Sequence, residues 1–286
     1  MANRVLVMRH AHRYSDTYSF GDDPQLTPQG HEQAQQVAEL LRSRDLPLVA
    51  IFRCAGAPAR PQQRTQLSYP WKCGARKSRA LSSSWTRRLT HAVLVLLLSS
   101  PWLRSIQTVA PLAAAMGLQI QVDRCFGEYL KAEGGHFAED PLPYLAYNTR
   151  AEKAGLPHVP AAVLAPDGGS PFPPFPETRA STLLRHKQAL ERVFARIAKD
   201  YADEEGTVLV VGHGASNDFI LYALCGEEAH PTGRYASDEV EPLPPPPHCC
   251  LTTIVKNGQG VWEVESYGQP TVSTSHANSA ATTPKL

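Results

Sequence analysis

The sequence predicts an α/β fold in three layers, an α/β/α sandwich with a mostly parallel central sheet. Short apolar runs of strand length alternate with longer amphipathic segments of helical period along the 286 residues. Two of the apolar runs end directly in histidines, VLVM before RHAHR and TVLVV before GHG. Because open α/β sheets bind ligands at the carboxyl ends of their strands, we expect His10 and His213 at one crevice.

The overall composition is that of an ordinary globular protein. Apolar residues make up 42% of the chain and the formal net charge is +1, which disfavours nucleic acid as a partner of the whole chain. The six cysteines show no CxxC motif, the first residues lack a signal-peptide pattern, and the longest apolar run, 92–98, is too short to span a bilayer. These features predict a cytoplasmic protein with reduced thiols and no membrane span.

The first strand and the first helix are clear in the sequence. The apolar run VLVM predicts a buried strand, and a polar loop, 14–25, separates it from the helix LTPQGHEQAQQVAELLRS. Thr27 is the expected N-cap of this helix and Pro28 its first residue, where a missing N–H costs nothing. LPLVAIF, which ends at Phe52, is a second strand candidate.

Residues 53–98 differ in kind from the rest of the chain. Nine Lys and Arg occur between Arg53 and Arg88, and no sustained hydrophobic period is present, so we expect a basic insertion of low order. Three interpretations are open: a patch for nucleic acid or anionic membrane, a regulatory loop, or a retained intron. Joining Phe52 to Ser99 gives LPLVAIFSSPWLRSIQT, an unbroken strand-then-helix pattern that favours the retained intron. If the segment is translated, VLVLLL is the alternative strand before Ser99.

The C-terminal part continues the alternation. SSPWLRSIQTVAPLAAAMG predicts a helix that Ser100 caps, Pro101 opens and Gly117 ends, and LQIQV follows as a short strand. After an irregular region, 125–175, a long helix is expected over about 177–201, then the strand TVLVV and the helix ASNDFILYAL. CCLTTIVK and GVWEVESY predict a hairpin with its turn at Asn257-Gly258. The chain is therefore expected to form a single domain over 1–272, interrupted at about 53–98, with a disordered tail at 273–286.

The basic residues after the first strand suit a phosphate, because guanidinium groups match its oxygens. Arg104 lies in the first turn of a helix, where free N–H groups and the helix dipole favour an anion. Taken singly, His213 can also be a core histidine at a tight turn, and Arg104 a solvated residue. His10 and His12 can be a metal pair, although this leaves the two flanking arginines unexplained.

Together these motifs resemble those of the histidine phosphatase superfamily, also called phosphoglycerate mutase-like. The similar segments occur in family order: RHAHR, LTPQGHEQA, SSPWLRSIQT, FGEY around Glu128, and VVGHG. One departure is Ala11, where most members have glycine. The resemblance implies a phosphoglycerate mutase-like fold and a phosphatase that hydrolyses phosphate monoesters without a metal or other cofactor.

The resemblance also implies a role for each site residue. His10 would be the nucleophile that forms a phosphohistidine, and Glu128 the acid that protonates the leaving oxygen and then the base for water. The residues that would bind the phosphate oxygens are Arg9, Arg13, Arg104 and His213. Rivals of Glu128 are Glu133, Asp16 and Asp22, and His12 is expected to be an exposed neighbour of the site.

Two features narrow the resemblance further. Gly214 follows His213 where acid phosphatases of the superfamily carry their aspartate, and Asp218 comes too late to match it. Arg13 and the stretch DRCFGEY look most like the phosphatase domain of the suppressor-of-T-cell-receptor-signalling proteins and plant relatives. The expected substrate is a phosphorylated small molecule or a phosphopeptide. Phosphoglycerate mutase-type phosphoryl transfer and an inactive phosphatase-like binding protein are the alternatives, and the oligomeric state stays open, with a homodimer as one option.

Overall fold

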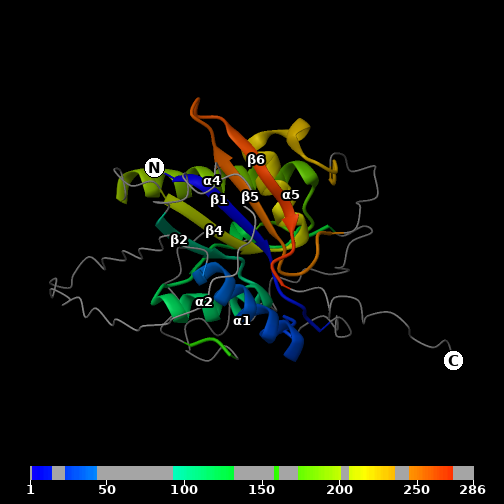
Figure 1. Cartoon of the computed structure of the whole chain (residues 1–286). Coiled ribbons are helices and arrows are strands. Elements are labelled where there is room, and N and C mark those ends of the chain that lie inside the picture. Colours follow the sequence, from blue (N-terminus) through cyan, green and yellow to red (C-terminus); the bar gives the residue numbers. More distant parts are fainter. Residues whose placement is uncertain are drawn as a thin grey trace, which may run out of the picture.

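The computed structural model of the chain describes residues 2–14, 23–43, 93–131, 158–160, 173–200, 206–235 and 245–272. A six-stranded sheet runs through these residues in the order β3-β2-β4-β1-β5-β6 (Figure 1). Its strands are β1 (Ala2–Arg9), β2 (Val93–Ser99), β3 (Gln121–Val122), β4 (Gly206–Gly212), β5 (Leu251–Lys256) and β6 (Trp262–Gln269). The four strands from β3 to β1 are mutually parallel, and β5 and β6 are antiparallel to their neighbours.

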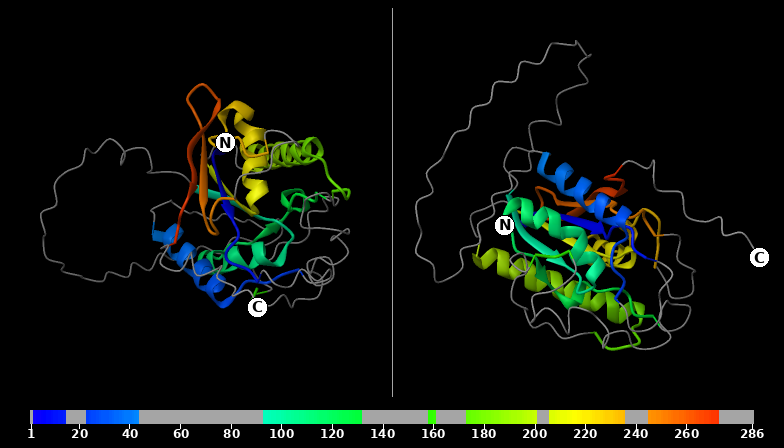
Figure 2. Two further views of the ribbon diagram at one scale, coloured as in Figure 1. Left: turned by 90° about the vertical axis from the view of Figure 1, so that its right-hand side faces the viewer. Right: turned by 90° about the horizontal axis from the view of Figure 1, so that it is seen from below.

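Helices cover both faces of the sheet. The helices α1 (Pro28–Ser43) and α2 (Leu103–Met116) lie on one face, and α4 (Arg179–Asp200) and α5 (Gly214–Cys225) lie on the other (Figure 1; Figure 2, left view). Successive residues of one strand serve opposite layers: Leu97 packs in the core with α1 and α2, whereas Leu98 packs in the core with α4 and α5. The predicted three-layer α/β fold is confirmed.

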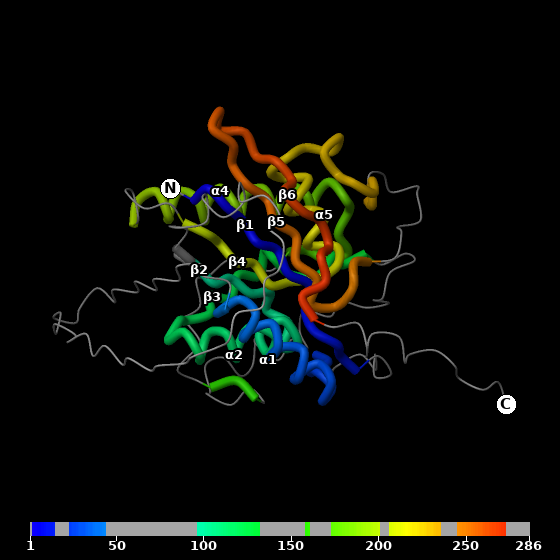
Figure 3. Tube along the Cα trace, in the orientation of Figure 1, coloured from blue at the N-terminus to red at the C-terminus, as the bar shows by residue number. Residues whose placement is uncertain are grey.

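The register of the sheet brings the ends of three strands to one edge. In the parallel ladder of β1 with β4, which run side by side through the centre (Figure 3), Arg9 pairs with Gly212. In the ladder of β2 with β4, Ser99 pairs with Val211. Because β5 runs antiparallel to β1, the residues just before Leu251 reach the same edge. Residues that follow β1, β2 and β4 therefore meet there.

The predicted start of α1 is confirmed, but that of α2 is wrong. The hydroxyl of Thr27 accepts from the backbone N–H of Gly30 at 3.0 Å, as an N-cap does. In α2 the N-cap is Trp102, and neither Ser100 nor Pro101 takes part in the first turn. The backbone N–H of Leu103 is satisfied instead by the carboxylate of Asp23, at 2.6 Å, so the helix needs no local cap.

The strand before α2 is formed by VLVLLL rather than by LPLVAIF. Leu96, Leu97 and Leu98 are buried in β2, which lies between β3 and β4. Residues 93–98, at the end of the insertion expected at about 53–98, therefore lie in β2, where an apolar run between two strands is well placed to fill the sheet. LPLVAIF, residues 53–92 and the predicted tail lie outside the described residues.

The other predicted elements match the structure closely. Gly117 ends α2 with a φ of 64°, as the left-handed C-terminal position of a helix requires. The hairpin of β5 and β6 turns at Asn257, whose carbonyl accepts from Gly260. Two 3-10 turns, η1 (Arg124–Phe126) and η5 (Glu227–Ala229), follow β3 and α5. None of the described helices is both long and apolar enough to cross a membrane.

Candidate active site

His10 lies directly after β1, where its backbone N–H donates to the Gly212 carbonyl at 2.9 Å. Its ring is buried, with Nδ1 2.7 Å from the carbonyl oxygen of Ala11. A carbonyl can only accept, so Nδ1 carries the proton and Nε2 keeps its lone pair. The backbone is held in turn by Thr108, which accepts from the Ala11 N–H at 2.9 Å. His10 is therefore fixed with an unprotonated Nε2.

His213 follows β4 and lies beside His10, with 5.4 Å between the ring centroids. Its Nδ1 lies 3.0 Å from Oε2 of Glu128, and its Nε2 lies 2.7 Å from the hydroxyl of Ser100. In the Nδ1–H tautomer, His213 donates to the carboxylate and accepts from the serine. His213, Glu128 and Ser100 thus form one hydrogen-bonded chain beside the first histidine.

Arg104 joins this chain from the first turn of α2. Its side chain is fully buried, with Nη2 3.2 Å from Oε2 of Glu128 and 3.1 Å from Nδ1 of His213. Its other terminal nitrogen lies 3.7 Å from Oδ1 of Asp23, and its guanidinium carbon lies 4.4 Å from the centroid of the Trp102 ring. Two carboxylates therefore balance the buried charge.

The arginines that flank His10 lie in different surroundings. Arg9 is half-buried and donates to the backbone carbonyl of Pro246, in the segment that leads to β5. Arg13 lies further out, where its guanidinium donates to the carbonyl of Tyr14 at 3.1 Å in an exposed position. The structure brings Arg104, Glu128 and His213 together with His10, and places Arg13 at the rim.

Burial and the neighbouring cations keep both histidines neutral. Burial lowers the pKa of His10 well below its usual value, and the charge of Arg104 lowers it further. Burial likewise lowers the pKa of His213 to about 4, although the carboxylate of Glu128 opposes the effect. At neutral pH, His10 is therefore an unprotonated imidazole among positive charges, as a nucleophile toward an anion needs to be.

His12, expected to be an exposed neighbour, has a structural position instead. Its Nδ1 lies 2.9 Å from the hydroxyl of Thr27, and its backbone N–H donates to Gln33 at 2.8 Å. The side chain is half-buried and ties the loop after β1 to the start of α1. In the part of the chain that the structure describes, no group of three or more His, Cys, Asp or Glu side chains is arranged to hold a metal ion.

Three residues at the site were missed by the sequence analysis. Ser100 and Asp23 contact His213 and Arg104 as described above, and the ring of His248 lies 5.3 Å from those of His10 and His12. The position of His248 could have been predicted from the sequence, because it stands three residues before a strand that can pair with β1. Glu133, Asp16 and Asp22, the rivals of Glu128, lie outside the described residues.

A comparison of the chain with known protein families found a match. A family profile described as "Histidine phosphatase superfamily (branch 1)" matches residues 74–267, which include Arg104, Glu128 and His213 but not the segment of His10. No curated protein sequence matches the chain.

Solved structures of phosphatases share the fold. Mycobacterial glucosyl-3-phosphoglycerate phosphatase is 18% identical with a TM-score of 0.51, covering 94% of this chain and 99% of that chain. The ecdysone phosphate phosphatase of Bombix mori, in complex with tungstate, is 18% identical with a TM-score of 0.52, covering 94% of this chain and 93% of that chain. At this level of identity the similarity shows the fold alone.

Proposed function

The chain belongs to the histidine phosphatase superfamily, and on that premise we propose that it hydrolyses phosphate monoesters through a phosphohistidine on His10. The family match confirms the superfamily and the enzyme class predicted from the sequence, a phosphatase. The observation that carries the assignment to His10 is its neutral ring, with Nδ1 bound to a backbone carbonyl and Nε2 unprotonated beside Arg104 and His213.

The first step transfers the phosphoryl group to the protein. Nε2 of His10 attacks phosphorus in line, an N–P bond forms, and the bond from phosphorus to the ester oxygen breaks. Arg104 and Arg9 balance the charge on the non-bridging oxygens, and Arg13 supports them from the rim. His213, which is neutral, contributes a hydrogen bond to these oxygens through its ring N–H. The carboxylate of Glu128, which pairs with Arg104 in the structure, takes up a proton from solvent before this step and then gives it to the leaving oxygen.

The second step releases phosphate. Glu128, now a carboxylate, takes a proton from water as the water oxygen attacks phosphorus, and the N–P bond breaks. His10 returns to its neutral form and inorganic phosphate leaves. The chain's own cations carry out the charge stabilisation that a metal supplies in other phosphatases.

The test of the proposal is turnover of para-nitrophenyl phosphate by the purified full chain, with vanadate as inhibitor. We expect His10→Ala to abolish turnover. After brief exposure to substrate with a radioactive phosphoryl group, the wild type should carry an acid-labile label on the protein, and His10→Ala should carry none. His31→Ala, a histidine in α1 whose ring contacts His158, serves as the matched control and should keep full activity. If the wild-type protein shows no vanadate-sensitive turnover, the proposed phosphatase activity is contradicted. The alternative, an inactive phosphatase-like binding protein, would then be favoured.

The role of Glu128 has its own signature. Glu128→Gln should slow the hydrolysis of esters with poor leaving groups, which need a proton, by about 100-fold, and should affect para-nitrophenyl phosphate much less. Equal losses on both kinds of ester would remove Glu128 from the acid role.

The proposal also covers the group of the superfamily to which the chain is most similar and the class of its substrate. Arg13 and the stretch around Glu128 support a place beside the phosphatase domain of the suppressor-of-T-cell-receptor-signalling proteins and plant relatives. The similar mycobacterial enzyme acts on glucosyl-3-phosphoglycerate, which supports a phosphorylated small molecule as substrate here. Four cysteines of the described residues form no disulfide, which supports a cytoplasmic location: Cys125, Cys225, Cys249 and Cys250. A panel of sugar phosphates, nucleotides and phosphotyrosine peptides would rank the substrate classes.

A further inference from the structure

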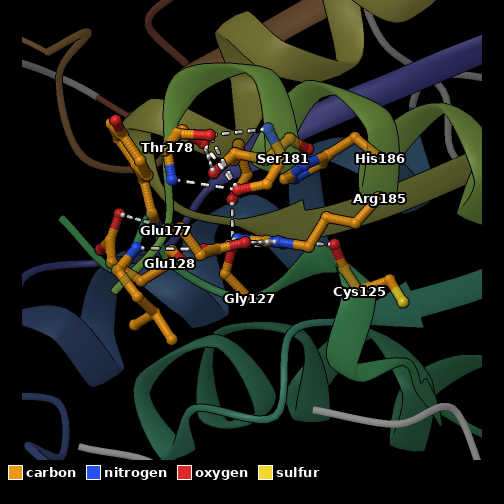
Figure 4. A network of polar contacts seen from close by, with 12 residues as sticks. Cys125, Gly127, Glu128, Glu177, Thr178, Ser181, Arg185 and His186 are labelled. Atoms are coloured by element: carbon orange, nitrogen blue, oxygen red, sulfur yellow. Dashed lines mark hydrogen bonds and ion pairs between the residues drawn. The ribbon is translucent and has the colours of Figure 1, made fainter. Parts of the chain in front are cut away.

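The segment that carries Glu128 has little regular structure of its own, but a side chain of another element organises it. The guanidinium of Arg185, in α4, faces three backbone carbonyls of this segment (Figure 4). Its Nη1 donates to the carbonyl of Cys125 at 2.5 Å and to that of Gly127 at 3.3 Å, and its Nη2 donates to the carbonyl of Glu128 itself at 2.8 Å. One planar group thus holds the backbone on both sides of the Glu128 side chain.

Glu177 completes this arrangement from the residues just before α4. Its carboxylate binds Arg185 in a bidentate pair, with distances of 2.6 Å and 2.8 Å. The same carboxylate accepts from the backbone N–H of Leu130 at 3.1 Å, and the backbone N–H of Glu177 donates to the Leu130 carbonyl at 2.8 Å. The ion pair therefore fixes both ends of the segment from Cys125 to Leu130.

The burial of this ion pair costs desolvation free energy, because Arg185 is only 8% exposed and Glu177 only 5% exposed. All the N–H groups of the guanidinium have acceptors, and none of its atoms is among the buried polar atoms without a partner. Ser216, in the first turn of α5, also binds the segment. Its hydroxyl donates to the Gly127 carbonyl at 3.1 Å. The Glu128 segment is thus fastened to the helix that follows His213 as well as to α4.

We propose that Arg185, oriented by Glu177, is a positioning residue that directs the carboxyl group of Glu128 toward the leaving oxygen. The inference rests on the proposed function, in which Glu128 is the general acid. Arg185 binds the Glu128 backbone and not the reacting atoms, so its effect passes through the place and angle of the carboxyl group. Proton transfer is sensitive to such placement, because donor and acceptor must come within hydrogen-bond reach.

The test is Arg185→Lys, which keeps the charge but replaces the planar fork by a single nitrogen that cannot reach three carbonyls and a carboxylate together. Turnover is measured on a series of aryl and alkyl phosphates from good to poor leaving groups. We expect kcat to fall by about tenfold or more on the poor leaving groups and by less than about threefold on para-nitrophenyl phosphate. In a Glu128→Gln background the substitution should cause no further loss.

Arg192→Lys is the matched control. Arg192 lies two turns further along the same helix, is half-exposed and contacts the thiol of Cys125 at 3.2 Å, but it does not touch the carbonyls of the segment. It should leave the leaving-group dependence unchanged.

Several results would overturn the positioning role. These are wild-type behaviour of Arg185→Lys, an equal loss on good and poor leaving groups, or a loss that multiplies with that of Glu128→Gln. If Arg185→Lys does not fold, Glu177→Gln takes its place with the same expected pattern, and loss of fold in both variants would assign the pair to stability alone. Failure of the wild type to turn over any ester would instead contradict the proposed function, so the two failures are distinguishable.

Discussion

Ser100 shows how one hydroxyl can matter at this site. It lies directly after β2, is fully buried, and its Oγ is 2.7 Å from Nε2 of His213. We expect Ser100→Ala to reduce kcat by about tenfold, the equivalent of about 1.4 kcal/mol, because His213 loses one of the two partners, Ser100 and Glu128, that orient its ring. Steady-state turnover of para-nitrophenyl phosphate measures the effect.

A second serine of the same region provides the control. Ser105 is also fully buried, in the first turn of α2, but its hydroxyl has no hydrogen-bond partner among the residues that the structure describes. Ser105→Ala should leave turnover unchanged. Equal behaviour of the two variants would show that the hydroxyl of Ser100 does not act through His213.

The site residues that could be predicted have a local sequence signal, whereas those that were missed depend on contacts with distant parts of the chain. His10 and His213 were predictable because each stands two residues after an apolar run, and parallel strands place such residues at one edge. Asp23 was not, because a carboxylate in a loop gives no sign of which helix it will cap. Ser100 was assigned as a cap, a common role for serine before a proline, and only the register with β4 reveals that its side chain meets His213.

At the level of the elements, a buried carboxylate joins α5 to the parts of the chain around it. Asp218, in α5, is fully buried and accepts from Tyr267 of β6 at 2.7 Å. His230 Nε2 lies 2.9 Å from the same oxygen, and Arg234 Nε lies 3.2 Å from the other. Asp218 therefore has a structural place, away from the acid role that a carboxylate following the second histidine fills in the acid phosphatases.

We expect Asp218→Ala to lower the free energy of unfolding by about 3–5 kcal/mol, because it leaves the guanidinium of Arg234 buried without its counter-charge. Chemical denaturation measures the loss. Glu265→Ala is the control, since Glu265 forms a half-exposed pair with Arg4 at 3.7 Å and its removal should cost at most about 1 kcal/mol. Similar losses in the two variants would contradict the importance of the buried network.

The helices and strands were predictable to different degrees. α1 carries its signals locally, in Thr27 and Pro28, so its start followed from the sequence. The start of α2 did not, because the group that satisfies its first N–H comes from Asp23, 80 residues earlier. For β2 the sequence offers two apolar runs for one place in the sheet, and local pattern alone cannot choose between them.

For the molecule as a whole, the buried histidines predict a loss of stability in acid. Burial lowers the pKa of His213 to about 4 and that of His248 to about 3, and it lowers the pKa of His10 as well. In the unfolded chain each would take up a proton near pH 6.5. The unfolded state then binds more protons than the folded state below that pH, so stability is present above about pH 6.5 and is lost as pH falls toward 4.

His213 alone would lower the free energy of unfolding by on the order of 2 kcal/mol between pH 7 and pH 5. Thermal unfolding at several pH values measures this, and His248→Gln, which removes one of the three rings, should make the dependence shallower. Lys256→Gln, on the exposed end of β5, is the control for the loss of a basic side chain. A transition temperature independent of pH between 7 and 5 would contradict the prediction.

The place of β2 leads to a prediction about the whole chain, because the retained-intron hypothesis provides a second sequence for that strand. A chain that lacks residues 53–98 joins LPLVAIF to Ser99 and keeps the spacing from strand to Arg104. Phe52 then takes the position of Leu98, facing α4 and α5, and Ile51 takes that of Leu97, facing α1 and α2. Both replacements are apolar, so the two cores keep their character.

We therefore expect the shortened chain to fold and to hydrolyse para-nitrophenyl phosphate at least as fast as the full chain. It should also be the more soluble of the two chains. The full chain carries two apolar runs, LPLVAIF and VLVLLL, but the position of β2 in the sheet takes only one of them, and a surplus apolar run favours aggregation. Expression yield, the unfolding transition and turnover, measured side by side, check this. A shortened chain that is insoluble or inactive while the full chain is active would show that Leu96, Leu97 and Leu98 are the native residues of the strand. Transcript reads that run continuously through the segment would lead to the same conclusion, and the nine basic residues between Arg53 and Arg88 would then need a function of their own.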